Sequence, residues 1–204
     1  NLDGIEDCLL IVSDDSGYAQ VPRSELRDGM KIKLKAWAKV SARWTGCKVP
    51  YLTLALWNID DMAHEPGVKS EGTAVFEHVK PSPFCVAAHF DENGDKEVEN
   101  FYYKFGVAKE GEQIDFPIGE SFVERKAHLL LPAGLPESLK LFACVVSSNR
   151  SEIAGNFTEL DEEFSKSVTP GTEYFRMCFP IDKNGDIKFF APKTGTRLFT
   201  CLTL

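Results

Sequence analysis

The chain has 204 residues, of which 43% are hydrophobic and 26% charged, and its formal net charge at pH 7 is −8. This length and composition exclude a disordered chain and predict a single β-rich domain over residues 1–204. The surplus of acids argues against nucleic acid as a partner, because proteins that bind phosphate backbones carry basic surfaces. No apolar run approaches the roughly 20 residues of a membrane-spanning helix, so we expect no membrane insertion.

The first clear element spans residues 31–40, where apolar and polar side chains alternate. Ile32, Leu34, Ala36, Ala38 and Val40 share one face, and the opposite face carries Lys31, Lys33, Lys35, Trp37 and Lys39. A period of two over ten residues is typical of a half-buried strand and excludes an amphipathic helix.

Further β-rich runs follow along the chain, separated by turn residues. They span residues 51–57, 73–79, 84–90, 101–107, 126–131, 139–146, 174–179, 187–190 and 197–204. About ten strands of this kind predict an all-β fold, an antiparallel β-barrel or β-sandwich. The stretches 58–71 and 106–122 are rich in Gly, Pro and charge, so we expect long decorated loops there.

Two similar turn sequences contain Asn93-Gly94 and Asn184-Gly185. Asn-Gly supplies the positive φ angles of a tight turn and predicts β-hairpins at both places. The alternating Asp and Asn residues also resemble a calcium loop, but Gly is fourth where the EF-hand pattern needs it sixth. A single short helix is expected after Asn156.

Catalytic and metal-binding motifs are missing from the sequence. It contains no G-x-S-x-G, no phosphate-binding G-x-x-x-x-G-K-[ST] and no H-E-x-x-H. A pair of carboxylates from distant strands stays open as a catalytic alternative, as does the adjacent pair His64-Glu65. The six cysteines lack zinc-site spacing. We therefore expect no enzyme, no catalytic residue, no metal and no cofactor, with the cysteines reduced in the absence of a secretory signal.

Binding by surface side chains fits this composition better than catalysis. The candidate receptor or glycan site is the basic face of residues 31–40, which combines an aromatic ring with four lysines: Lys31, Lys33, Lys35, Trp37 and Lys39. Acids outnumber basic residues between 91 and 124, so the basic face alternatively meets an acidic surface of a twin subunit. The third hypothesis is that the basic face is simply exposed to solvent, where its lysines prevent edge-to-edge aggregation. Other aromatic residues available for stacking on sugar rings are Tyr18, Trp44, Tyr51 and Trp57, although Trp44 and Trp57 also suit a core.

The ends of the chain and its general character resemble one viral family. The chain begins with Asn1 and stops within an apparent strand at Leu204, which we interpret as a domain excised from a longer polypeptide. Its size and the strand-rich close, from GTEYFRMCFPID at residues 171–182 onward, resemble an astrovirus capsid spike such as an avian one. The resemblance extends over the whole chain and includes no diagnostic motif.

This resemblance implies a compact β-barrel core with decorated loops and a homodimer. It also implies that the domain attaches to a host-cell receptor and has no enzymatic activity. A spike of this kind is made in the host cytoplasm and lies on the virion surface. No site residue is carried over from the family. The alternative is a carbohydrate- or protein-binding β-sandwich of a cellular or bacterial protein.

Overall fold

The fold is all-β, as predicted. The computed structural model describes residues 9–46, 48, 51–60, 63–65, 67–70, 72–90, 100–120, 122–131, 133–134, 140–148, 169–181, 184–193 and 196–203. Within these ranges the regular elements are fifteen strands and one 3₁₀ turn, η1 (Arg23–Glu25). There are more strands than the sequence predicted, because several short ones lie in stretches that read as loops.

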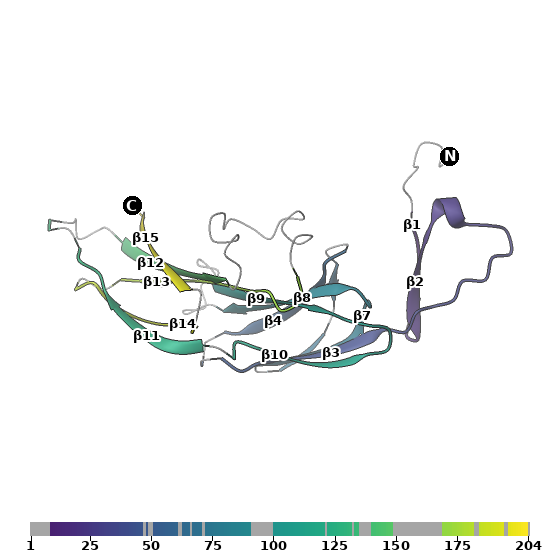
Figure 1. Cartoon of the computed structure of the whole chain (residues 1–204), viewed down its shortest axis with the longest axis horizontal. Helices are drawn as coiled ribbons and strands as arrows, with labels where there is room; N and C mark the ends of the chain where they lie inside the picture. Colours follow the sequence, from purple (N-terminus) through teal and green to yellow (C-terminus); the bar gives the residue numbers. More distant parts are fainter. Residues whose placement is uncertain are drawn as a thin grey trace.

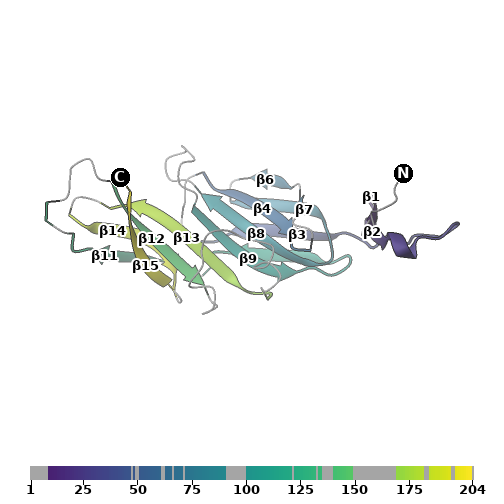
Figure 2. The same ribbon diagram turned by 90° about the horizontal axis from the view of Figure 1, so that it is seen from above.

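The larger layer of the molecule is a seven-stranded antiparallel sheet (Figures 1 and 2). Its strand order is β15-β12-β13-β9-β8-β4-β5. The strands, in this spatial order, are β15 (Thr196–Thr203), β12 (Lys140–Ser148), β13 (Glu173–Pro180), β9 (Asn100–Val107), β8 (Pro83–Phe90), β4 (Thr53–Asn58) and β5 (His64–Glu65).

The facing layer consists of two smaller sheets, with the orders β10-β3-β7-β6 and β11-β14. Their strands are β10 (Gln113–Ile118), β3 (Ala38–Trp44), β7 (Thr73–Val79), β6 (Val68–Ser70), β11 (Phe122–His128) and β14 (Asp186–Pro192). β10 and β3 run parallel, whereas the other pairs in this layer are antiparallel. The described strands form open sheets in two layers, so the architecture is a sandwich and the predicted barrel alternative is wrong.

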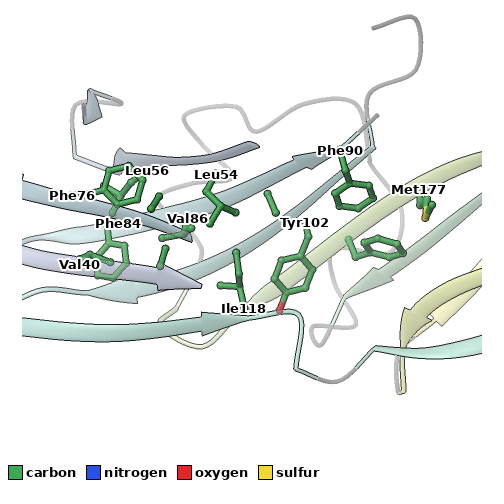
Figure 3. Packing of buried hydrophobic residues seen from close by; sticks show 14 of the residues in the cluster. Val40, Leu54, Leu56, Phe76, Phe84, Val86, Phe90, Tyr102, Ile118 and Met177 are labelled. Atoms are coloured by element: carbon green, nitrogen blue, oxygen red, sulfur yellow. The ribbon is translucent and has the colours of Figure 1, made fainter. Parts of the chain in front are cut away.

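The core lies between the two layers and follows the alternation of each strand (Figure 3). Its largest fully buried side chains come from both layers and include Tyr102, Phe76, Phe84 and Phe175. Because successive side chains of a strand point to opposite faces, burial of every second residue against the other layer stabilises both sheets.

Two predicted loops contain strands. The stretch 58–71 holds β5 and β6, and the stretch 106–122 holds β10. All three strands lie at sheet edges. β5 and β6 are also very short, so their sequences show little alternation between polar and apolar residues.

The predicted hairpin at Asn184-Gly185 is wrong, because the flanking strands β13 and β14 belong to different layers. Gly185 has φ +83°, and a Cβ there would lie 2.1 Å from the carbonyl oxygen of Leu129, so the turn needs glycine for a crossing between layers. For the hairpin predicted at Asn93-Gly94, the flanking strands β8 and β9 do pair antiparallel, with Phe90 opposite Asn100, but the two turn residues lie outside the described residues. The helix expected after Asn156 also lies outside them.

A β-hairpin precedes the sandwich and was missed in the sequence. β1 (Leu9–Asp14) and β2 (Gly17–Pro22) form a separate two-stranded sheet that stands away from the two layers (Figures 1 and 2). No residue of this hairpin belongs to the main described core. We call it the N-terminal hairpin.

The predicted strand over residues 31–40 is only partly correct. Strand β3 begins at Ala38, and residues 31–37 form a connection from the N-terminal hairpin to the sandwich. Within this connection a single β-bridge joins Lys35 to Tyr18. The alternating pattern specifies which side chains share a face, but a strand also requires a neighbouring backbone to pair with, and here only one residue has it.

Candidate functional site

The first candidate site is the lysine segment, residues 31–37, together with Lys39 at the start of β3. Lys31, Lys33 and Lys35 are exposed, and the apolar residues between them are half-buried. The predicted division of this stretch into a basic and an apolar face is therefore confirmed, even though most of it is not a strand.

The four lysines differ in their electrostatic partners. Lys39 Nζ lies 2.7 Å from Glu77 Oε1 across the β3–β7 pair, and both side chains are partly exposed. In the part of the chain that the structure describes, Lys31, Lys33 and Lys35 have no ion pair. Three positive charges are thus available to an anionic partner, and the fourth is largely compensated by Glu77.

Trp37 is half-buried, and its ring is engaged in contacts with the N-terminal hairpin and with β7. Its ring stacks on Tyr18 with 4.8 Å between centroids and an interplanar angle of 21°, and His78 meets it edge-on at 5.6 Å. Its indole Nε1–H donates to the backbone oxygen of Asp14 at 2.7 Å. Because these contacts join the N-terminal hairpin to the start of β3, Trp37 holds the hairpin in place.

The turn of the N-terminal hairpin is organised by one carboxylate. Asp14 Oδ1 accepts hydrogen bonds from Ser16 Oγ at 2.6 Å, Ser16 N at 2.7 Å and Gly17 N at 3.2 Å. These donors, the Ser16 hydroxyl first, lower the pKa of Asp14 below its ordinary value. A Cβ on Gly17 would lie 2.2 Å from the carbonyl oxygen of Lys35, so glycine allows the lysine segment to approach β2.

A second candidate site lies on the outer face of the seven-stranded sheet, opposite the core. We call it the outer aromatic cluster, and it consists of Trp57, His64, His89, Phe101, Tyr103 and Tyr174. The Trp57 ring is 5.8 Å from His64, 5.8 Å from His89 and 6.4 Å from Tyr103. Phe101 lies 4.8 Å from Tyr103 and 5.6 Å from Tyr174.

Small residues beneath the rings explain how this cluster forms. Ala55 and Ala87 lie opposite each other on β4 and β8, and both are buried although they point away from the sandwich core. Trp57 and His89 flank this alanine pair diagonally, and Tyr103 lies directly opposite Ala87 on β9. Large rings that lean over two small neighbours pack closely and still leave Trp57, His89 and Tyr103 half-buried.

The remaining aromatic predictions have separate outcomes. Trp44 belongs to the core, where it packs on Phe90, Tyr102 and Phe122 at centroid distances of 5.3 to 5.8 Å. Tyr18 is buried under Trp37, and Tyr51 is 68% exposed. The signal for the outer aromatic cluster was present in the sequence as odd-numbered rings in 101–107, but their convergence with Trp57 depends on strand order.

A third group of polar residues joins the two layers. Lys104 Nζ donates to the carbonyl oxygen of Pro117 at 2.8 Å and lies 3.7 Å from Glu173 and 3.9 Å from Glu120. Burial, and then the negative charge of Glu173, raise the pKa of nearby Tyr102 well above its ordinary value. A lysine with two carboxylates beside it is electrically compensated, so we assign this group to the attachment of β9 to β10 and β13.

Among the described residues, no group of three or more His, Cys, Asp and Glu side chains is arranged to hold a metal ion. None of the helical structure in these ranges is long and apolar enough to cross a membrane. Comparison of the chain with protein-family models, with curated proteins and with solved structures finds no match.

Proposed function

We propose that this chain is an attachment domain: the surface projection of a non-enveloped virus capsid protein, which binds a host-cell receptor as a homodimer on the virion. In this proposal the receptor carries an anionic glycan, the lysine segment contacts it, and the domain performs no catalysis. The all-β class supports the proposal because it agrees with the β-rich core that the resemblance implies, although the described strands form open sheets and not a closed barrel.

The observation that carries the proposal is the set of three exposed lysines without ion pairs in the described part of the chain. Lys31, Lys33 and Lys35 are exposed and the residues between them are half-buried, so the three side chains lie on one side of the connection. Residues two apart along a chain are at most about 7 Å from each other, so the three charges form a short row. A row of this kind matches repeated sulfate or carboxylate groups on a glycan.

The experiment reverses two of these charges. The double variant Lys33→Glu with Lys35→Glu should bind immobilised heparin and sialylated glycans at least about tenfold more weakly at physiological salt, because attraction is replaced by repulsion. Both side chains are exposed, so the thermal unfolding midpoint should stay close to that of the unchanged protein.

A matched control separates the lysine segment from the net charge. Lys126 and Lys193 are exposed lysines near β11 and β14, at the other end of the molecule (Figure 1), and have no ion pair within the described ranges. The double variant Lys126→Glu with Lys193→Glu changes the net charge equally and should retain binding. Equal loss in both double variants, or no loss in either, would remove the lysine segment from the proposal.

The outer aromatic cluster favours a second candidate function, a carbohydrate-binding β-sandwich of a cellular or bacterial protein. Half-buried Trp57 and Tyr103, with exposed His64 beside them, offer ring faces and polar ring edges of the kind that sugar-binding surfaces use. This candidate predicts binding of neutral oligosaccharides that is lost in Trp57→Ala and is insensitive to salt. Binding of anionic glycans alone, lost in the Lys33 and Lys35 double variant, favours the first proposal.

A further inference from the structure

The open edge of strand β1 is the feature that points to a further interaction. β1 pairs with β2 over six residues, from Leu9 opposite Pro22 to Asp14 opposite Gly17. Within the described residues, no other strand pairs with β1. The N-terminal hairpin also stands clear of the sandwich, so this edge is not covered by either layer (Figures 1 and 2).

The hydrogen bonds of Tyr18 show which backbone groups of β1 point outward. Tyr18 N–H donates to Lys35 O at 2.9 Å, and Lys35 N–H donates to Tyr18 O at 2.8 Å. Tyr18 therefore directs both groups away from β1, and its partner Ser13 forms a non-hydrogen-bonded pair with it. Because such pairs alternate along an antiparallel ladder, Leu9, Ile11 and Ser13 direct their N–H and C=O groups to the open edge.

The side chains of β1 do not protect this edge. Natural edge strands are usually blocked by lysine, proline or a bulge, whereas β1 has the sequence LLIVSD with a single charge at its last residue. Leu10 is 39% exposed and Ile11 is 56% exposed. An uncharged, regular edge with these residues is a template for another strand.

We propose that β1 pairs antiparallel with β1 of a second copy of this chain, about a two-fold axis at Ile11. This inference rests on the homodimer of the proposed function and names its contact surface. The two hairpins then form one continuous intermolecular sheet, with the order β2-β1-β1-β2.

In this register the outward backbone groups of the two copies face each other. With Ile11 opposite Ile11 of the second copy, Leu9 of each copy lies opposite Ser13 of the other. All three pairs are then hydrogen-bonded pairs, which gives about six intermolecular bonds. A strand that meets its own copy about a two-fold axis is self-complementary, as an isologous interface requires. Asp14 does not lie opposite another charge in this register, so no like-charge repulsion opposes it.

The first test places a charge at the axis. Ile11→Lys puts two lysines directly opposite each other, so the dissociation constant of the dimer, measured by sedimentation or light scattering, should rise at least tenfold. The control Leu130→Lys introduces the same charge at a leucine that is 91% exposed and follows β11, at the other end of the molecule, and should leave the dissociation constant unchanged.

The second test reads the register. Ile11→Cys places two thiols at paired positions whose Cα atoms are about 5.5 Å apart, within the range that a disulfide spans. Leu10→Cys is the matched control, because residue 10 lies opposite residue 12 and not opposite itself. Mild oxidation should crosslink Ile11→Cys into a dimer on a non-reducing gel, at least tenfold faster than Leu10→Cys.

The possible outcomes are distinct. A dimer that Ile11→Lys leaves intact would overturn the β1 surface and leave the homodimer of the proposed function standing. A wild-type chain that stays monomeric at all accessible concentrations would overturn both. Faster crosslinking of Leu10→Cys than of Ile11→Cys would overturn the register.

Discussion

Trp37 provides the sharpest prediction, because its contacts attach the N-terminal hairpin without taking part in the main core. We expect Trp37→Ala to open the hairpin locally and to leave the sandwich folded. The change removes the indole hydrogen bond to Asp14, the stacking on Tyr18 and the edge contact with His78.

The magnitude follows from these contacts. The hydrogen bond contributes about 1 kcal/mol and each ring contact about 0.5 to 1.5 kcal/mol, so the hairpin loses about 2 to 4 kcal/mol of local stability. A loss of about 2.8 kcal/mol accelerates exchange of the protected amides about a hundredfold. Trp37→Phe keeps the ring and loses only the hydrogen bond, so its effect should be near fivefold.

Hydrogen exchange followed by NMR measures the local stability of the hairpin at two reporter amides. The N–H groups of Tyr18 and Lys35 bond to each other's carbonyl oxygens, so both exchange when the hairpin opens. Amides of β8 in the seven-stranded sheet serve as the internal control and should exchange as in the unchanged protein. If Trp37→Ala lowers the protection of β8 as much as that of Tyr18, the hairpin and the sandwich unfold together and the reasoning is refuted.

Three further predictions concern the core, a thiol and a carboxylate. Phe84→Ala should lower the free energy of unfolding in denaturant by about 3 to 5 kcal/mol, because Phe84 is fully buried and packs on Phe116 at 5.0 Å. Cys85 should resist iodoacetamide at pH 8 in the native protein and react in denaturant, since burial raises the pKa of its thiol far above the ordinary value. An NMR titration of Asp14 should have its midpoint below about 3.9, the value of an unperturbed aspartate, because Ser16 stabilises the carboxylate. A pKa lowered by folding means that this carboxylate contributes stability above the unfolded-state pKa and that the contribution is lost as the pH falls through the folded-state pKa.

Each of these three predictions would be contradicted by a specific result. A loss below about 1 kcal/mol in Phe84→Ala would remove that side chain from the core, because even small buried deletions cost that much. Native Cys85 that reacts as fast as the denatured thiol would show that its strand is accessible. A midpoint for Asp14 at or above the unperturbed value would show that the turn hydrogen bonds are absent in solution.

The sequence predicted the sandwich strands well where alternation is long. The run 73–79 coincides with β7, and the runs 84–90 and 101–107 lie within β8 and β9, because the two-residue period is a local property of the chain. Strand β10 was missed because it contains Pro117, which breaks the pattern. Proline is tolerated there since β10 is an edge strand that, among the described strands, pairs with β3 alone.

The N-terminal hairpin was missed for a different reason. Its turn residues, Asp14 to Gly17, are typical of turns, and in the structure the Asp14 carboxylate holds this turn. The flanking runs 9–12 and 18–21 do not alternate between polar and apolar residues, so they were not predicted as strands, and the exposed edge of β1 was missed with them.

By itself the sequence determined which side chains alternate, and therefore the all-β class and the row of exposed lysines at 31, 33 and 35. Only the tertiary structure decided what each face meets. It brought Trp37 into contact with residues about twenty positions earlier in the chain, and it gathered rings from five strands on one outer face. The two-residue period of a strand is a local property, because successive side chains of an extended backbone point to opposite faces. Strand order and layer contacts depend instead on how distant segments bury apolar area together, and no local pattern encodes that.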